Sequence, residues 1–290
     1  MIKKPVTLRS DLDMESRPIA HLVQEASQYD STVYIEMDNM KINAKSIMGM
    51  MSLKLQKGED VTIVADGQDE DAAVRENFRR LAGAMKTDVS KFVFTDQTHT
   101  TNVRRVTAED AGKGIVKERD YTDIDGLITN EPGLVLSTFY ADCVPLYFVD
   151  PVHRAIGMSH SGWKGTVGKM GAATITAMKR EFGTEAKDLV CAIGPSICQD
   201  CYEVSEDVAD AFKEAFPGHA DEILLDKKNG KYQLDLWGAN EIVLTEAGVL
   251  KEKIAVTNIC TCCNPDLLFS HRASHGKRGN LGAFIYLRNA

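Results

Sequence analysis

The chain has 290 residues, of which 43% are hydrophobic and 26% charged, a composition typical of soluble globular proteins and a length sufficient for two domains. The net charge of −8 argues against a general nucleic-acid binder. No apolar run approaches the roughly 20 residues of a membrane-spanning helix, and the polar N-terminus lacks a signal-peptide core. The seven cysteines are an odd number, which favours thiols or metal ligands over disulfides. We therefore expect a cytoplasmic protein that binds neither nucleic acid nor membrane.

The first 86 residues alternate short strand-like and helix-like runs. The order of these runs is β-α-β-β-α-β-α, which predicts an open-faced β-sandwich with helices on one side of an antiparallel sheet. The strand-like runs are residues 6–8, 32–37, 41–43 and 60–65, and the helix-like runs are 18–29, 46–53 and 69–85.

The same residues resemble HPr, the phosphocarrier of the sugar phosphotransferase system (PTS), through SRPIAHLVQEAS, NAKSIMGMMSL and VADGQDEDAA. In that family a histidine just before an Arg-Pro pair accepts a phosphoryl group at a helix N-terminus, where backbone N–H groups stabilise the anion. Here Glu15 stands at that position, so we do not expect carrier activity. Ser46 matches the regulatory phosphorylation site of the family, and its structural alternative is a helix N-cap. We hypothesise a degenerate regulatory or docking module that contacts PTS-related proteins.

Residues 87–290 continue in an α/β (α+β) pattern, with the 69–85 helix shared at the junction of the two domains. Strands are expected at 91–96, 133–139, 145–150, 154–159, 189–194, 253–259 and 283–287, and helices at 166–183, 205–216 and 235–248. The periodic apolar spacing of 166–183 and its terminal Gly183 are typical of a helix with a glycine C-cap. These elements predict a mixed sheet layered with helices.

Three metal-ligating side chains lie at the ends of predicted strands. His99 follows the run FVF, Cys143 precedes LYFV, and His160 follows AIGM. One thiolate and two imidazoles suit zinc, three protein ligands would leave a position for water or substrate, and zinc lowers the pKa of bound water to near 7. On spacing alone the structural alternative is favoured, with Cys143 a small buried side chain and both histidines hydrogen-bonded.

A second resemblance covers roughly residues 72–290. The motifs VRENFRRL, DQTH, DGLITNEPGL, ADCVPLYFVDP, HSGWKGTVG, AIGPSICQDCYEV, LDLWGAN, CTCC and SHR occur in one order. Together they resemble the laccase-domain family, also called multicopper polyphenol oxidases and peptidoglycan editing factors. The resemblance implies that His99, Cys143 and His160 bind zinc. Copper is less favoured, because the chain lacks the repeated His-x-His motifs of a multicopper centre.

The resemblance also implies a purine-nucleoside enzyme. Its expected reactions are phosphorolysis of adenosine, inosine, guanosine and methylthioadenosine, and deamination of adenosine at the same site. Phosphate needs cationic or N–H donors, for which we nominate Arg272, with an ion pair as its structural alternative. Further candidates are Ser270, His271 and Lys164, with Trp163 stacking on a base or packing in the core, and Asp142 orienting a ligand or capping a turn.

The chain departs from the family at three places. Thr100 follows His99 where glycine is usual, and Lys164 replaces arginine, which loses the planar fork for bidentate contacts. The HPr-like segment occupies the space of the family's own N-terminal strands, so part of the pocket is missing or comes from another chain. Cys198 and Cys201 have CxxC spacing, but Cys260 and Cys262 do not, and we predict no second metal site from them.

Three other functions stay open. A cysteine hydrolase would use Cys143 as nucleophile and His160 as base. The physiological task of such an enzyme could be the editing of peptidoglycan precursors. A non-catalytic regulatory protein would instead use the degenerate HPr-like domain, with Glu15 and Ser46 as its distinguishing features.

Overall fold

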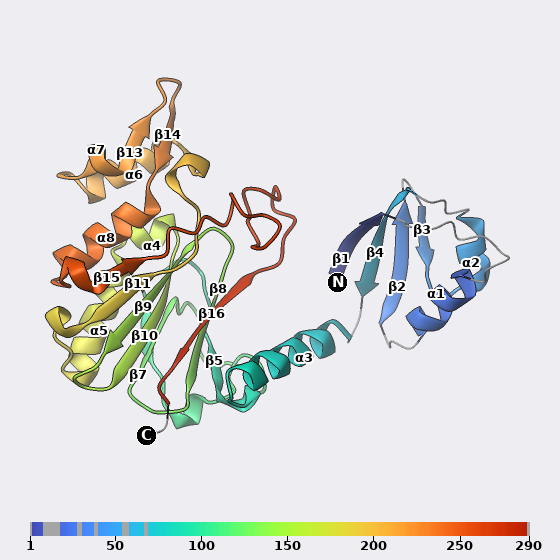
Figure 1. Ribbon diagram of the computed structural model, residues 1–290, viewed down its shortest axis with the longest axis horizontal. Helices are drawn as coiled ribbons and strands as arrows, with labels where there is room; N and C mark the ends of the chain where they lie inside the picture. Colours follow the sequence, from blue (N-terminus) through green and yellow to red (C-terminus); the bar gives the residue numbers. More distant parts are fainter. Residues whose placement is uncertain are drawn as a thin grey trace. The chain divides into compact units, whose positions relative to one another are not determined.

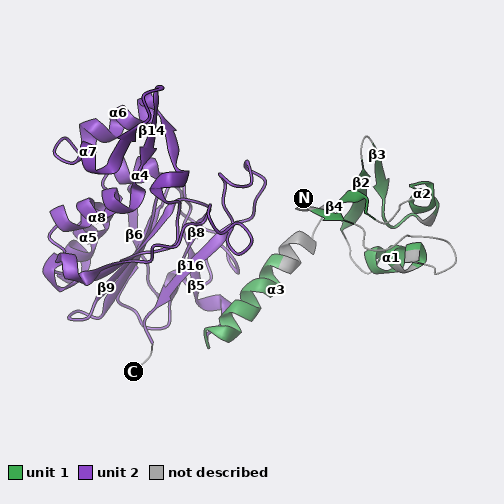
Figure 2. Cartoon of the chain, turned by 45° about the horizontal axis from the view of Figure 1, so that its top comes forward, with its two compact units in different colours: residues 1–86 green, residues 87–290 purple. Residues whose placement is uncertain are grey.

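The computed structural model describes residues 2–7, 18–27, 31–37, 40–53, 58–66 and 69–288. The chain divides into two compact units, residues 1–86 and 87–290, which Figure 2 colours separately. Each unit has its own hydrophobic core. Within the described ranges, no helix is both long and apolar enough to cross a membrane.

The first unit is a four-stranded antiparallel sheet in the order β1-β4-β2-β3, with α1 and α2 packed on one face (Figure 1). Its core joins Ile19 and Met50 of these helices to Ile35 and Val61 of the sheet. The elements are β1 (Ile2–Thr7), α1 (Pro18–Ser27), β2 (Thr32–Met37), β3 (Met40–Asn43), α2 (Ile47–Ser52), β4 (Asp60–Asp66) and α3 (Asp69–Ala84). The predicted open-faced β-sandwich is confirmed.

Two residues singled out in this unit have different outcomes. Ser46 is the N-cap residue of α2, because its side-chain oxygen accepts a hydrogen bond from the Gly49 amide at 3.2 Å. Its predicted capping role is therefore present. Glu15 lies outside the described residues.

The second unit is built on a six-stranded mixed sheet in the order β15-β11-β9-β10-β7-β6. Two three-stranded sheets, β16-β8-β5 and β12-β14-β13, accompany it. The strands are β5 (Phe92–Phe94), β6 (Val103–Arg105), β7 (Gly126–Thr129), β8 (Val135–Tyr140), β9 (Val144–Asp150), β10 (Ala155–Ser161), β11 (Val190–Ile193), β12 (Glu203–Ser205), β13 (Leu224–Asp226), β14 (Lys231–Leu234), β15 (Ile254–Val256) and β16 (Leu281–Tyr286). The predicted mixed-sheet layered fold is confirmed.

Both faces of the six-stranded sheet are covered. Helices pack on one face, and the β16-β8-β5 sheet packs on the other (Figure 1). The helices are α4 (Trp163–Val167), α5 (Met170–Phe182), α6 (Glu206–Ala215), α7 (Ala220–Ile223) and α8 (Leu236–Glu246). Every residue of β10 is buried, because this strand lies between the two layers. Side chains on such a strand alternate between the layers, and His160 is on the side of β8, near Tyr140.

The structure differs from the predicted elements at two points. The helix expected at 166–183 is divided into α4 and α5, because Lys169 has a left-handed φ of 61° and interrupts the helical backbone. The predicted C-cap is present, with Gly183 at a φ of 76°. The predicted elements also do not include strands β6, β7, β12, β13 and β14, each of which has only three or four residues.

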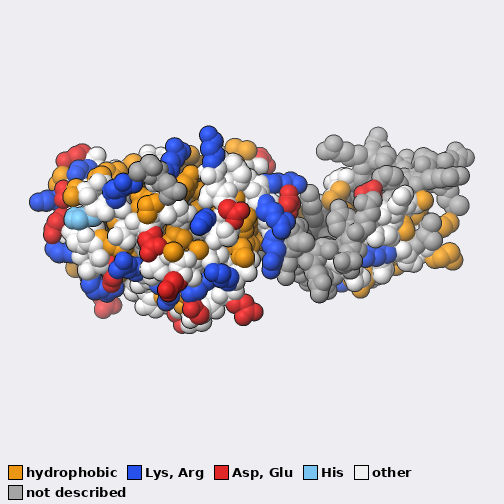
Figure 3. Space-filling model, turned by 90° about the horizontal axis from the view of Figure 1, so that it is seen from below, with side chains coloured by type: hydrophobic (Ala, Val, Ile, Leu, Met, Phe, Trp, Pro, Cys, Tyr) orange, Lys and Arg blue, Asp and Glu red, His pale blue; other side chains and the backbone are white. Residues whose placement is uncertain are grey.

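Side chains of both charges lie on the surface of the second unit. On the face of the second unit that Figure 3 shows, basic and acidic side chains are interspersed.

Candidate metal centre

Three nominated residues come together where strands end. His99 lies in the loop between β5 and β6, Cys143 immediately precedes β9, and His160 is the penultimate residue of β10. One ligand atom from each lies within 4.8 Å of those of the other two. The rings of His99 and His160 are 4.9 Å apart and nearly perpendicular, at 75°. One metal ion therefore fits between the thiol and the two imidazoles.

A buried carboxylate orients two of these residues. Asp125, fully buried just before β7, accepts hydrogen bonds at Oδ1 from His160 Nδ1 at 2.8 Å and from the His99 amide at 3.1 Å. Its Oδ2 accepts the amides of Thr98 at 3.1 Å and Thr100 at 2.8 Å. Because Nδ1 of His160 is occupied, Nε2 is the nitrogen left for a metal. Burial would raise the pKa of Asp125, but these hydrogen bonds and the nearby imidazole lower it.

The thiol of Cys143 has an environment suited to a thiolate. Burial favours the neutral thiol, but hydrogen bonds from His160 and His99 outweigh it and lower its pKa to about 7. Burial likewise opposes the charge on His160, yet its bonds to Asp125 and Cys143 raise its pKa to about 9. Since metal ligation by cysteine requires the thiolate, the two imidazoles favour the ligand form of Cys143.

The backbone around the centre is held in uncommon conformations. His99 has a φ of 67°, and Asp142, next to Cys143, has a φ of 84°. Non-glycine residues in this left-handed region cost free energy and concentrate at functional sites. Gly162 allows the close approach of the ligands, because a Cβ there would lie 2.9 Å from Cys143 Sγ and 3.1 Å from His99 Cδ2.

Gln97 holds the His99 loop against β8. Its side-chain amide exchanges hydrogen bonds of 2.7 Å with both the carbonyl and the amide of Phe139. Its oxygen also accepts the Thr95 hydroxyl at 2.9 Å. The glutamine of the Gln-x-His motif thus fixes the loop.

A cavity of about 300 Å³ opens beside the three ligands. Two arginines line it. Arg119 is paired with Asp96 at 2.8 Å, whereas Arg278 contacts the Asn280 side chain and has no carboxylate partner among the described residues. The wall comprises Thr95, Gln97, His99, Arg119, Phe139, Tyr140, Ala141, Cys143, His160, Arg278 and Asn280. The cavity therefore combines a metal-ligating group, aromatic surface and cationic donors.

The other nominated residues lie elsewhere. The Arg272 guanidinium donates to the carbonyls of Cys201 at 3.2 Å and Glu203 at 2.9 Å. Ser270 is buried, and its Oγ accepts the Ala273 amide at 3.1 Å. None of Arg272, Ser270, His271, Trp163 and Lys164 lines the cavity, and Trp163 packs against the helical core. The roles nominated for them stay predictions.

Asp142 supports a loop, and Asp125 orients the ligand. The Asp142 carboxylate accepts the Thr261 hydroxyl and the Arg272 amide, both at 2.7 Å. The role of Asp125 was not predicted from the sequence, although this residue begins the motif DGLITNEPGL. Arg119 and Arg278 were not predicted either, because they lie in irregular segments without a motif.

Comparison with known proteins identifies the family. The model of the multi-copper polyphenol oxidoreductase laccase family matches residues 57–288, and a model named for the PTS HPr component phosphorylation site matches residues 2–78. The purine nucleoside phosphorylase YlmD of Bacillus subtilis is 39% identical over 226 residues, which span 77% of this chain and 80% of the relative. Adenosine deaminase RL5, from an unknown prokaryotic organism, is 33% identical over 269 residues, or 87% of this chain and 99% of that protein.

A solved structure agrees with these sequence matches. The crystal structure of the Bacillus licheniformis hypothetical protein YfiH is 36% identical and superimposes with a TM-score of 0.73. The match covers 75% of this chain and 82% of that one. Because a family model spans more than half of the chain, and the fold and the three-ligand centre accompany it, this protein belongs to the multi-copper polyphenol oxidoreductase laccase family.

Proposed function

We propose that the protein is a zinc-dependent purine nucleoside phosphorylase that also deaminates adenosine. The observation that carries this proposal is the convergence of His99, Cys143 and His160 at the wall of a cavity that Arg278 also lines. Relatives named purine nucleoside phosphorylase and adenosine deaminase support it. The expected substrates are adenosine, inosine, guanosine and methylthioadenosine, together with phosphate.

Zinc is the metal that this donor set favours. A thiolate and two imidazoles are common zinc ligands, and three protein ligands leave a fourth position for substrate or water. When bound there, zinc would supply Lewis-acid chemistry to a polar group of the substrate or to water. Asp125 would hold the proton of His160 on Nδ1, which keeps Nε2 directed toward the metal.

Phosphate binding is the second requirement of phosphorolysis. Arg278 is the cation best placed for it, because it lines the cavity and has no carboxylate partner among the described residues. Arg119 would add positive charge, although Asp96 offsets part of it. The contacts of Arg272 support a positioning role for it, since its guanidinium holds the carbonyls of Cys201 and Glu203.

The test is one assay on protein whose metal content has been measured. Incubation with adenosine and phosphate should release adenine and ribose-1-phosphate, and inosine should form in parallel. A His160→Ala variant should lose both activities and the metal. Full occupancy of the centre with zinc, and turnover no greater than that of the variant, would overturn the proposal.

A cysteine hydrolase is the second candidate. His160 forms a hydrogen bond with the thiol of Cys143, and its other nitrogen pairs with Asp125. A cysteine beside a base that is itself oriented by a third group is the arrangement that activates cysteine nucleophiles. The two candidates respond oppositely to reagents. A thiol hydrolase is inactivated by alkylation and survives chelation, whereas a zinc enzyme loses activity with a chelator and regains it with zinc.

For the first unit we propose docking rather than phosphotransfer. Ser46 is exposed at the start of α2, and Met48, in the same helix, has 78% of its surface exposed. These features support contacts with PTS-related proteins and make Ser46 a candidate phosphorylation site. Labelled phosphate should not pass to this protein from purified PTS enzyme I, because Glu15 replaces the accepting histidine. Transfer would refute the docking-only role.

We also propose a cytoplasmic location. All seven cysteines are free thiols in the structure, and reducing compartments keep thiols in that form. Fractionation of cells that produce the protein tests this.

A further inference from the structure

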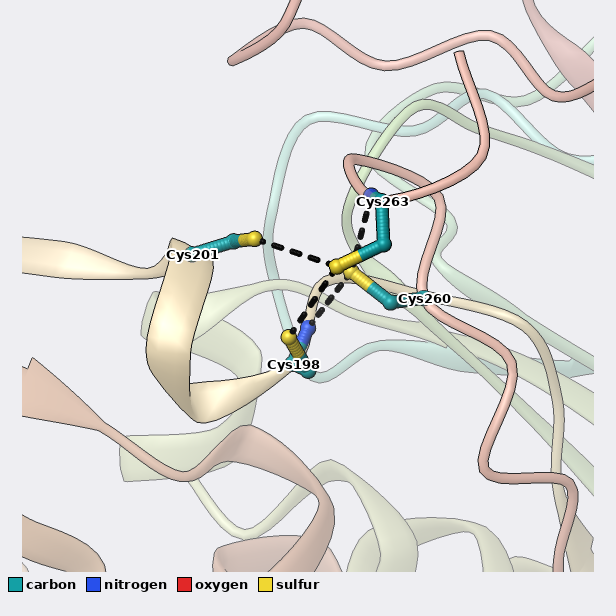
Figure 4. A group of neighbouring side chains, drawn as sticks. All are labelled: Cys198, Cys201, Cys260 and Cys263. Carbon is teal, nitrogen blue, oxygen red and sulfur yellow. Dashed lines mark hydrogen bonds between the residues drawn. The ribbon is translucent and has the colours of Figure 1, made fainter. Parts of the chain in front are cut away.

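Four cysteines outside the candidate metal centre form a second cluster. Cys198 and Cys201 flank the short turn before β12, and Cys260 and Cys263 follow β15. Their four sulfur atoms all lie within 4.8 Å of one another, and Figure 4 shows the side chains directed to a common point. The second pair is Cys260 and Cys263, not the Cys260 and Cys262 considered from the sequence. Both pairs therefore have CxxC spacing.

The dimensions of the cluster are those of a metal tetrathiolate. With Zn–S bonds of about 2.3 Å, the sulfurs of a tetrahedral site lie about 3.8 Å apart. Cys263 Sγ is 3.9 Å from Cys198 Sγ and 3.4 Å from Cys201 Sγ. A disulfide would need a separation of about 2.05 Å, and all four cysteines are free.

Backbone amides are directed at one of the sulfurs. The amides of Cys198 and Cys263 both donate to Cys260 Sγ at 3.3 Å. Two N–H donors on one sulfur favour a thiolate, because hydrogen bonds to the charged form stabilise it. Cys260 is also the most buried of the four, so an ion bound to it would be partly shielded from water.

We propose that Cys198, Cys201, Cys260 and Cys263 hold one structural zinc ion. Four protein ligands complete the tetrahedral shell and leave no position for a substrate, which is the mark of a structural site. This group shares no residue with His99, Cys143 and His160, and none of its members lines the cavity. It is therefore a second site with a different task.

The task follows from what the two cysteine pairs connect. An ion bound by both pairs would fix residues 198–201 to residues 260–263. Residues in or next to both segments contact Asp142. The Ile197 amide donates to the Asp142 carbonyl at 3.0 Å, and the Thr261 hydroxyl donates to its carboxylate at 2.7 Å. Asp142 precedes Cys143 in a left-handed conformation. A zinc ion in the cluster would thus stabilise the loop that presents Cys143.

The experiment counts zinc in full-length protein that lacks the first centre. A His99→Ala/His160→Ala variant, prepared under reducing conditions, should retain one zinc per chain. X-ray absorption at the zinc edge should show four sulfur neighbours at about 2.3 Å. Adding Cys198→Ser and Cys263→Ser should remove this zinc, whereas adding Cys262→Ser, the matched control, should leave it.

The outcomes decide the proposal without depending on the folding of the serine variants. Absence of zinc from the histidine variant, or a shell containing nitrogen or oxygen, would overturn the structural site. A mass lower by two hydrogens per cysteine pair in unalkylated protein would show a disulfide instead and would also overturn it. Because the His99→Ala/His160→Ala variant lacks the first centre, the result is independent of the proposed nucleoside chemistry.

Discussion

His160 Nδ1 donates to Asp125 Oδ1 across 2.8 Å, and both side chains are almost completely inaccessible to solvent. The same carboxylate also accepts backbone amides at 98, 99 and 100. One buried charge therefore sets the ring orientation of one candidate ligand and the loop conformation of another. Partners of this kind fix the ring orientation of metal-ligating histidines and raise the basicity of the ligating nitrogen.

We expect Asp125→Asn to lower metal affinity by about 10- to 100-fold. An asparagine can accept a hydrogen bond at only one of its two terminal atoms, so the contacts to His160 and to the Thr100 amide cannot both be kept. Competition with a chelator measures the affinity. Asp123→Asn is the matched control, because Asp123 is exposed and its carboxylate accepts the Thr98 hydroxyl at 2.7 Å, a hydrogen bond that an asparagine oxygen can also accept. Equal affinities in both variants would contradict the role of Asp125.

Gly162→Ala should weaken the metal site without changing the chemistry of any ligand. Its new Cβ would lie 2.9 Å from Cys143 Sγ, and overpacking of this kind costs about 1–3 kcal/mol, equivalent to about 5- to 100-fold in affinity. Gly165→Ala is the control, since its Cβ would meet no atom closer than 3.5 Å. If Gly162→Ala binds metal as tightly as Gly165→Ala, the close approach is unimportant.

Arg278→Gln should raise the KM for phosphate. Loss of a charge-assisted hydrogen bond costs about 1.5–3 kcal/mol, or about 10- to 100-fold. Deamination of adenosine uses no phosphate and provides the internal control, so its kcat/KM should stay close to that of the wild type. A parallel loss of both activities would instead indicate that Arg278 supports the cavity wall.

Asp110→Asn should destabilise the second unit at neutral pH. Burial would raise the pKa of Asp110, but hydrogen bonds from Lys113 at 2.7 Å, from the Thr107 amide and from Arg104 lower it. A lowered pKa stabilises the fold at pH values above the usual aspartate pKa of about 3.9, and this contribution is lost as pH falls through the folded-state pKa. Denaturant unfolding at pH 7 should show a loss of about 1–3 kcal/mol.

The matched control for this change is Asp120→Asn. Asp120 also pairs with Lys113, at 2.9 Å, but 63% of its side chain is exposed, so its replacement should leave stability near that of the wild type. The difference between wild type and Asp110→Asn should shrink in acid. A difference that is constant from pH 7 to pH 3 would show that charge has no part in it.

The three residues of the candidate metal centre could be predicted from the sequence because each lies next to a predicted strand. His99, Cys143 and His160 stand at the ends of strong apolar runs, and functional side chains concentrate in the loops next to such strands. Asp125 was harder to recognise. It lies 35 residues from His160 in sequence, beside the short strand β7, and only the pairing of β7 with β10 brings the two together.

Arg278 and the cysteine cluster were equally difficult to predict from the sequence. Arg278 belongs to an irregular segment, so no periodicity relates it to the cavity. The two cysteine pairs are 62 residues apart where Cys198 meets Cys260, and spacing within each pair says nothing about which pairs meet. These contacts depend on loops whose conformations are set by long-range hydrogen bonds.

The sequence by itself determined the two-part organisation, the layered α/β class and the three candidate ligands. The spacing of apolar residues and the ends of strands are local properties, so they can be read directly from the sequence. Only the tertiary structure decided that Asp125 orients His160, that Arg272 supports a loop while Arg278 faces the cavity, and that Cys263 completes the sulfur cluster. Each of these depends on which distant segments pack together, and packing is a property of the whole fold.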